Sequence, residues 1–386
     1  MSRIMSAMHL VTYPVSVAVP QVLGLIVLSA VEFGQFSLMY LSYAFAVSLL
    51  LSVVSEPYAR ADQFLRDKVA SVYQSVAGAI SLLAASVTLA CGVLVGVGWV
   101  NVVLAMAAVY CASSWTSSRY QLVHLGVATK VFMVELAGIS SVITVVGLVA
   151  IVDELTLSTV LLCWLLHNAV CILGTRSLAV PSFSRLIWWV RQLKHHVRPL
   201  LAESLIQDLG AIGVPFILAP FLGSASFGRY RAISNIAFPV RLGMSAARPM
   251  LARKSIGRLL SPKWILAAVG AFSILGLTAG AVLEWLPHLV SFGGVVLELD
   301  RYAVACGLFV FSNGLNFYFY FVSRVHASGA ELFRHRLAQT VLVIAGPLGG
   351  LAADGESGAV WGFVTAALLS VPIWYSCARR SQPRKA

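Results

Sequence analysis

The sequence predicts an all-α, polytopic membrane protein with about twelve transmembrane helices, arranged as two parallel six-helix repeats. Composition is the first reason: of 386 residues, 59% are hydrophobic and only 11% are charged, with a mean hydropathy of +0.87. Apolar runs long enough to cross a bilayer recur from end to end, and one motif occurs in each half. About twelve spans of about 20 residues leave only short connections, so no soluble catalytic domain fits.

Each expected span is an apolar run between charged residues or Gly- and Pro-rich breaks. The first half is expected to hold spans at 9–30, 36–55, 71–95, 99–115, 131–152 and 157–175. The second half is expected to hold spans at 199–222, 226–247, 264–286, 302–323, 337–353 and 358–377. The long apolar run from Val69 to Trp115 is thus divided into two spans.

The basic residues gather on one side of this predicted bundle. The connections that follow odd-numbered spans carry acidic residues, namely Glu32, Asp153, Glu154, Glu298, Asp300, Asp354 and Glu356. The other connections and the two termini hold all but four of the 27 Lys and Arg residues. The positive-inside rule therefore places both termini in the cytoplasm. The net charge of +12 follows from this topology, so it does not indicate nucleic-acid binding.

Three further features complete the organisation. The apolar run after Arg3 is too long for a secretory signal and is expected to be an uncleaved first span. The six cysteines fall within predicted spans without metal-ligand spacing, so neither a metal nor another cofactor is expected. A cytoplasmic linker at 177–198 is expected to separate an N-terminal half (1–176) from a C-terminal half (199–386).

The linker region reads FSRLIWWVRQLKHHVRPLL and is both basic and amphipathic. The residues that share its apolar face at helical spacing are Leu186, Trp189, Val190, Leu193 and Val197. Basic residues lie largely on another face. We therefore expect this segment to lie flat on the anionic cytoplasmic leaflet.

The two halves share a sequence motif. The first half contains VPQVLGLIVLSAVEFGQFSLMYLSYAFAV (19–47), and the second contains VPFILAPFLGSASFGRYRAISNIAFPV (214–240). Both read Val-Pro, an apolar run, Phe-Gly, a polar residue, an aromatic residue and later Ala-Phe. Because both copies start on the same side of the membrane, the repeats are parallel, an architecture of moving halves that predicts a transporter.

Two parallel halves, with FGQF or FGRY opening the second helix of each, resemble the polysaccharide flippases. These are the Wzx-type O-antigen and exopolysaccharide exporters of the multidrug/oligosaccharidyl-lipid/polysaccharide exporter superfamily. The resemblance implies transport without catalysis: a polyprenyl-pyrophosphate-linked oligosaccharide is flipped to the outer leaflet by alternating access. It also implies a prokaryotic cytoplasmic (inner) membrane, and lipid-linked oligosaccharide, membrane lipids and polysaccharide-assembly proteins as partners.

Three arginines lie in the span at 226–247, where the charge pattern predicts none. They are Arg229, Arg231 and Arg241. A pyrophosphate that crosses the low-dielectric core needs cationic partners, and Arg supplies bidentate donors that stay charged. All three are therefore candidate substrate-binding residues.

Each arginine also has a structural interpretation. In a hairpin of the spans at 199–222 and 226–247, Asp208 lies level with Arg241, and Glu203 lies level with Arg248, so both are candidate ion pairs. Arg229 and Arg231 have no acidic residue opposite them in this hairpin. They either reach the outer interface with their head groups or line an outer mouth for an anionic headgroup.

Polar residues elsewhere in the spans supply weaker candidates. Asn313, Asn316 and Tyr320 share a face of the span at 302–323, where they either bind sugar or hydrogen-bond to other helices.

Glu135, His167 and Asn168 lie within the fifth and sixth spans. They either couple transport to H⁺ or Na⁺ or form buried structural hydrogen bonds.

Other classes of membrane protein fit the sequence less well. A multidrug antiporter of the same superfamily is the main alternative, but it is expected to hold an acid within the first-half lumen, and the first span has only Glu32 at its outer end. A membrane glycosyltransferase or polymerase needs larger outer loops with acidic residues. An ATP-driven pump needs GxxxxGK[ST], which is absent.

Overall fold

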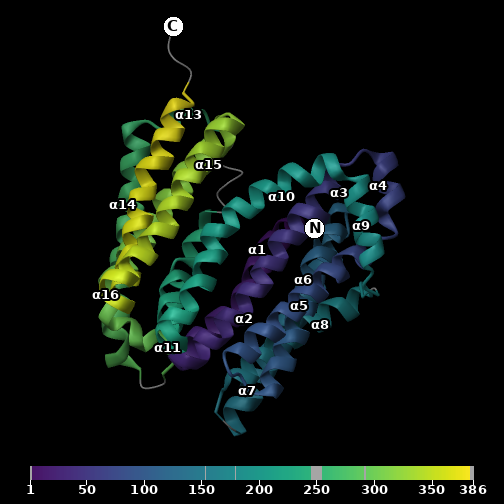
Figure 1. The fold of residues 1–386 in the computed structure, drawn as a ribbon, viewed down its shortest axis with the longest axis horizontal. Coiled ribbons are helices and arrows are strands. Elements are labelled where there is room, and N and C mark those ends of the chain that lie inside the picture. The colour runs from purple at the N-terminus through teal and green to yellow at the C-terminus, as the bar shows by residue number, and fades with distance from the viewer. Residues whose placement is uncertain (1, 153, 179, 245–253, 291–292, 383–386) are drawn as a thin grey trace. The chain divides into compact units, whose positions relative to one another are not determined.

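The computed structural model describes residues 2–152, 154–178, 180–244, 254–290 and 293–382, with side chains from residue 15 onward. The described residues form helices and short connections, without a β-strand (Figure 1). Eight helical segments of the described chain are long and apolar enough to cross a membrane. Two of them cover two predicted spans each: Gly329–Arg380 covers both of its spans in full, and Lys194–Met244 covers the span at 226–247 as far as Met244. The predicted all-α, polytopic membrane fold is confirmed.

Helices occupy each predicted span of the first half. They are α1 (Ser2–Val27), α2 (Ala30–Leu49) with the π-helical turn η1 (Leu50–Ser55), α5 (Tyr73–Leu94), α6 (Trp99–His124), α7 (Ala128–Val152) and α8 (Leu157–Thr175). The long apolar run divides between α5 and α6, as predicted. Two short helices, α3 (Glu56–Arg60) and α4 (Gln63–Ala70), connect η1 to α5.

Helices also occupy the predicted spans of the second half. They are α10 (Lys194–Asp208), which continues through η2 (Leu209–Gly213) into α11 (Val214–Ile236), then α14 (Pro262–Leu289), α15 (Ala303–His326) and α16 (Gly329–Arg380). Residues 238–244 are helical as well. The connections hold α9 (Phe183–Gln192), α13 (Ile256–Leu259) and the 3₁₀ helix η3 (Val295–Tyr302).

Two of these helices bend where the sequence predicts a connection. α11 bends at Gly223, with φ 72°, and α16 bends at Asp354 and Gly355, the latter with φ 55°. Such positive φ values are open to glycine at little cost because it has no Cβ. The bend in α16 separates a first arm, which starts at Gly329, from a second arm, which ends at Arg380.

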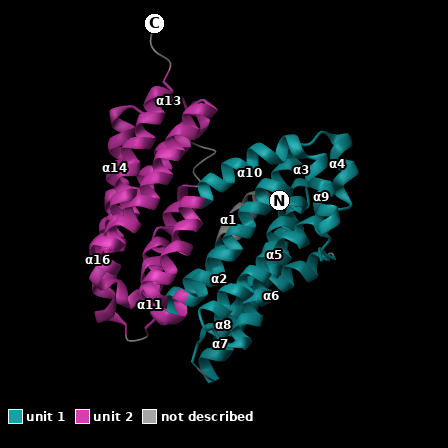
Figure 2. Cartoon of the chain, viewed as in Figure 1, with its two compact units in different colours: residues 1–28, 35–208 teal, residues 29–34, 209–386 magenta. Residues whose placement is uncertain are grey.

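The chain forms two compact units (Figure 2). Unit 1 contains residues 1–28 and 35–208, and unit 2 contains residues 29–34 and 209–386. In unit 1, α6 contacts α5 and α8, and α7 contacts α1 and α8. In unit 2, α15 contacts α14 and α16, and α11 contacts α16. α10 therefore belongs to unit 1, whereas the start of α2 belongs to unit 2.

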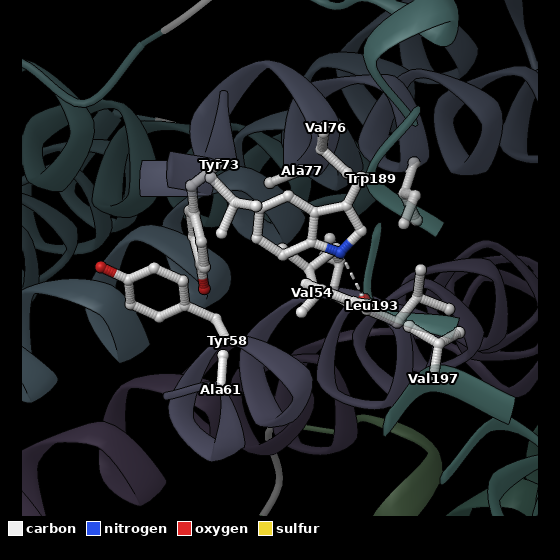
Figure 3. Close-up of a cluster of buried hydrophobic side chains, with 13 residues drawn as sticks. Val54, Tyr58, Ala61, Tyr73, Val76, Ala77, Trp189, Leu193 and Val197 are labelled. Atoms are coloured by element: carbon white, nitrogen blue, oxygen red, sulfur yellow. Dashed lines mark hydrogen bonds between the residues drawn. The ribbon is translucent and has the colours of Figure 1, made fainter. Parts of the chain in front are cut away.

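The amphipathic linker is helical, but protein covers its apolar face. Trp189 of α9 is 0% exposed and lies beside Tyr58 and Tyr73 in a buried cluster of unit 1 (Figure 3). Its Nε1 donates to the carbonyl oxygen of Val53 at 2.8 Å. Leu193 is buried in the same cluster. Protein therefore covers most of this face. Helical spacing predicts an apolar face but not what covers it, and the position of the segment on the leaflet stays a prediction.

The glycines of the repeated Phe-Gly motif lie against each other within unit 2. A Cβ on Gly34 of α2 would lie 1.9 Å from the carbonyl oxygen of Ser224, and a Cβ on Gly228 of α11 would lie 2.0 Å from that of Ala30. No side chain fits at either position. The motif therefore marks the point where the backbones of α2 and α11 touch.

The aromatic residue two places after each glycine packs in an equivalent way. Phe36 contacts Trp164 of α8 in unit 1, with ring centroids 6.0 Å apart. Tyr230 contacts Phe363 in the second arm of α16 in unit 2, at 5.2 Å. Since α8 and that arm are the sixth spans of their halves, the predicted repeat extends from the sequence motif to the packing of each half.

The two arms of α16 also meet at glycines. A Cβ on Gly350 would lie 1.9 Å from the carbonyl oxygen of Gly358, and one on Gly346 would lie 2.5 Å from that of Gly362. Each arm carries its glycines four residues apart, the small-xxx-small spacing that lets membrane helices approach closely.

We expect Gly228→Ala to lower the free energy of unfolding by about 2 kcal/mol, the middle of the range for overpacking. The new methyl group meets a backbone carbonyl, which cannot move aside as a side chain can. Gly147→Ala in α7 is the matched control, because a Cβ there has no atom within 4 Å. Unfolding of the purified protein in detergent measures both variants, and equal stability of the two would contradict the close contact.

Candidate functional site

Unit 1 holds a small, partly open pocket of about 10 Å³, lined by both polar and apolar groups and roughly large enough for the centre of one water molecule. Side chains from α1, α2, α6 and α8 line it, including Ser16, Tyr43, Thr116, His167 and Asn168, with Trp115 and Trp164. The hydroxyl oxygens of Tyr43 and Thr116 lie 3.2 Å apart. Asn168 donates to the carbonyl oxygen of Trp164 at 2.7 Å. Among the described residues, no carboxylate lines this pocket.

A buried ion pair joins α6 to α7 in unit 1. Arg119 Nε lies 2.9 Å from Glu135 Oε1, and the two side chains are 13% and 0% exposed. The sequence singled out Glu135 but placed Arg119 in a connection beyond the span ending at 115. α6 instead continues to His124, which carries Arg119 to the carboxylate. The charge of Glu135 is therefore balanced by a guanidinium.

Arg229 forms the centre of a charged network in unit 2. Its Nε and Nη2 each lie 2.7 Å from an oxygen of Glu356, and its Nη1 lies 3.0 Å from Glu298 Oε2. The expectation that this arginine lacks an acidic partner is wrong. That expectation considered only the hairpin that contains Arg229. The two acids lie 127 and 69 residues after Arg229 in the sequence, on α16 and η3.

Glu356 connects the other members of this network. Its Oε1 accepts hydrogen bonds from Arg301 Nη2 at 2.8 Å and from Tyr302 Oη at 3.1 Å, and its Oε2 accepts one from Ser226 Oγ. Glu356 belongs to the connection between the two arms of α16. Burial raises the pKa of its carboxyl, but hydrogen bonds from Arg229 and Ser226 and the positive charges of Arg229 and Arg301 outweigh burial and lower the pKa to about 2.

The other sequence-predicted cations and acids belong to α10 and to the segment that follows the Gly223 bend. Arg231 and Arg241 are half-buried in unit 2. Asp208 is buried and Glu203 is exposed, both on α10 of unit 1. The predicted Asp208–Arg241 pair joins residues of different units, and Arg248 lies outside the described residues, so both predicted pairs stay predictions.

The polar face of α15 turns toward neighbouring helices. Asn316 Nδ2 donates to the carbonyl oxygen of Ala367 in α16 at 2.8 Å, which is the interhelical hydrogen bond of the alternative interpretation. Asn313 is half-buried, and its Oδ1 has no hydrogen-bond partner among the described residues. Tyr320 accepts a hydrogen bond from Arg324 Nη1 at 2.8 Å. Sequence reasoning missed this last contact because it took Arg324 only as part of a basic connection.

We expect Glu356→Gln to lower the free energy of unfolding by about 3 kcal/mol, because it leaves the half-buried Arg229 without its bidentate partner. Glu298→Gln is the control: that side chain is 43% exposed and makes one contact with Arg229, so we expect less than about 1 kcal/mol. Chemical unfolding of the purified variants measures both losses. Equal losses of stability in the two variants would contradict the conclusion that the bidentate contact with Glu356 is the main partner of Arg229.

The effect of Glu356→Gln should also depend on pH. Because the folded pKa of Glu356 lies near 2, below the ordinary value of 4.5, its stabilisation is fully present above about pH 4.5 and is lost as pH falls toward 2. The difference in stability between wild type and Glu356→Gln should therefore be the same at pH 8 and pH 5, and smaller at pH 3. A difference that already shrinks between pH 8 and pH 5 would contradict the lowered pKa.

We expect Glu135→Gln to destabilise unit 1 by about 3 kcal/mol, since it leaves the half-buried Arg119 charged without its carboxylate. The double variant Arg119→Gln, Glu135→Gln should recover at least half of that loss, because no unpaired charge remains. Unfolding free energies of both single variants and the double variant measure the coupling. Losses that simply add in the double variant would argue against the pair.

Comparisons with known proteins show the fold. No family model and no curated protein matches this chain. The structure of the lipid II flippase MurJ in an inward closed conformation is 12% identical with a TM-score of 0.61, and the match covers 98% of this chain and 86% of that chain. A point mutant of the Vibrio cholerae MATE transporter VcmN is 14% identical with a TM-score of 0.55, covering 98% and 94%. An outward-facing multidrug resistance MATE family transporter of the MOP superfamily is 12% identical with a TM-score of 0.53, covering 97% and 92%. At these identities, the chain has the helical fold that these membrane transporters share.

Proposed function

We propose that this protein is a transporter that flips a polyprenyl-pyrophosphate-linked oligosaccharide from the cytoplasmic to the outer leaflet by alternating access. The observation that carries the proposal is the fold: a lipid II flippase matches over 98% of this chain with a TM-score of 0.61. The proposal takes its lipid-linked substrate from that flippase, since the fold itself is also shared with MATE transporters. The proposal places the protein in a prokaryotic inner membrane with both termini in the cytoplasm, in polysaccharide biosynthesis and export.

In this proposal, arginines of unit 2 meet the pyrophosphate. Arg231 and Arg241 are half-buried on the segment that follows the Gly223 bend, where guanidinium donors would meet an anion in a low-dielectric setting. Arg229 would bind phosphate only after it releases Glu298 or Glu356. In this proposal it therefore binds substrate only in a state in which one of these ion pairs is broken. Asn313, Asn316 and Tyr320 supply hydrogen-bonding and stacking groups for sugar.

Multidrug antiport is the second candidate, because two of the similar structures are MATE transporters. Two places in unit 1 give it little support. No carboxylate of the described residues lines the pocket of unit 1, and Glu135 is already bound by Arg119. A cationic substrate or a coupling cation would have no unbalanced negative charge to bind at either place.

Reconstitution into liposomes tests the proposal. Purified protein is incorporated with a polyprenyl-pyrophosphate oligosaccharide that carries a fluorescent label on the sugar, and dithionite reports the fraction exposed outside. We expect transfer between leaflets at least tenfold faster than in protein-free vesicles. Transfer at the protein-free rate, together with proton-driven uptake of ethidium, would overturn the flippase proposal in favour of the antiporter.

The same assay tests the proposed binding residues. We expect the double variant Arg231→Gln, Arg241→Gln to slow lipid transfer at least tenfold, because the pyrophosphate loses two cationic partners. Arg60→Gln is the matched control, since it removes the same charge from a side chain that is 57% exposed in unit 1. Unchanged transfer in the double variant would remove both arginines from the site.

A further inference from the structure

The end of unit 2 opposite the Arg229 network holds a second group of cations. Arg336 of α16 lies over two rings, with its Cζ 4.5 Å from the centroid of Tyr320 and 5.0 Å from that of Trp374. Arg324 of α15 donates from Nη1 to the Tyr320 hydroxyl at 2.8 Å. The rings of Tyr320 and Trp374 lie 4.9 Å apart, edge to face. We call these four residues the basic aromatic cluster.

The cluster lies at one level near the ends of three helical segments. Tyr320 and Trp374 each precede the end of their helix, His326 and Arg380, by about six residues, and Arg336 follows the start of α16 at Gly329 by about seven. At about 1.5 Å per residue, all three lie about 9 to 10 Å inward from the helix ends. The polar layer on each side of a bilayer is about 5 to 8 Å thick. A bilayer whose polar layer begins at these helix ends would place the rings and Arg336 at or just below the depth of lipid headgroups, and Arg324, two residues from the end of α15, within the polar layer.

These two arginines carry positive charge that no carboxylate balances in the described part of the chain. Arg336 donates from Nη1 to Gln339 Oε1 at 2.9 Å, and Arg324 donates to a tyrosine hydroxyl, so both hydrogen-bond acceptors are neutral. At the other end of unit 2, Arg229 and Arg301 both contact Glu356. A guanidinium has five N–H donors, and an aromatic ring against its flat face leaves its edges open.

A second pair of cations extends the same surface. Lys254 Nζ lies 4.1 Å from the centroid of the Trp264 ring, and Arg258 Cζ lies 5.8 Å from it. Trp264 belongs to the same apolar cluster as Tyr320 and Trp374. Four cations at this end of unit 2 are thus held by aromatic rings, and none of them pairs with an acid among the described residues.

We propose that Arg324 and Arg336 form a binding site for the phosphate or diphosphate group of a lipid. Guanidinium edges match phosphate oxygens in pairs, and a site near the ends of apolar helices can be reached by the headgroup of a lipid whose chains lie beside those helices. Two sources carry this chemistry. An anionic phospholipid of the surrounding leaflet would make it a lipid site independent of transport. The diphosphate of a lipid-linked oligosaccharide would make it an entry site, and that second source rests on the proposed function.

Lipid binding to the purified full-length protein tests the site. The probes are phosphatidylglycerol and an unglycosylated polyprenyl diphosphate, each titrated into protein in a detergent-free nanodisc of zwitterionic phosphatidylcholine and quantified by native mass spectrometry. We expect Arg336→Gln and Arg324→Gln each to weaken lipid binding at least tenfold. The Arg324 side chain is exposed. Arg334→Gln is the matched control, because it removes the same charge from an exposed position on the same helix. The affinity of Arg336→Lys should lie between those of the wild type and Arg336→Gln, since lysine keeps the charge but loses the planar pair of donors.

The outcomes separate the possibilities. Equal losses for Arg334→Gln and Arg324→Gln, or no loss in any variant, would overturn the site and leave only the general attraction of a basic surface for anionic lipid. Loss of both probes in Arg324→Gln and Arg336→Gln supports a general lipid-phosphate site, and loss of the polyprenyl diphosphate alone supports an entry site. Because phosphatidylglycerol binding does not require transport, this result stands even if the liposome assay shows no flipping.

Discussion

Lipid deprives the helices of the force that packs soluble proteins, because hydrocarbon chains are as apolar as the side chains they would replace. Close approach of backbones at small residues takes the place of that force. Gly34 and Gly228 bring α2 and α11 into contact, and glycines hold the two arms of α16 together. The bend between those arms places Glu356 where Arg229 binds it with two hydrogen bonds of 2.7 Å. The charged network therefore depends on packing that only glycine allows.

Carboxylates lie beside the arginines at one end of unit 2, whereas aromatic rings lie beside those at the other end. Arg229 is 15% exposed, and such a charge is costly unless a carboxylate balances it, which Glu356 and Glu298 do. Arg324 is exposed and Arg336 is half-buried, so aromatic faces and polar surroundings suffice to hold them. Ion pairs hold the Arg229 end of unit 2 together. At the end that contains Arg324 and Arg336, the N–H donors of the guanidinium groups remain available to an anion.

Local patterns in the sequence predict much of this fold. The apolar runs predict the helices because a membrane span needs its length of apolar residues, and the shared Phe-Gly motif predicts the repeat because both glycines face a backbone. Contacts across long stretches of sequence are not predicted in the same way. The partners of Arg229 come from η3 and α16, and Trp189 meets the carbonyl of Val53, 136 residues earlier. Periodicity indicates which face of a helix is apolar or charged, but tertiary packing decides what that face meets.

The repeat also explains why charge differs between the halves. Within the motif, the glycine and the aromatic residue two places later make equivalent contacts in both copies, so packing constrains them. The residue between them is Gln35 in the first copy and Arg229 in the second. Packing leaves that position able to vary, and in unit 2 it carries a charge that Glu356 and Glu298 balance. The positive charge of Arg229 is therefore compensated locally by Glu356 and Glu298. Arg324 and Arg336 instead have neutral hydrogen-bond acceptors and lie near the ends of their helical segments, so their charge is available to a bound phosphate.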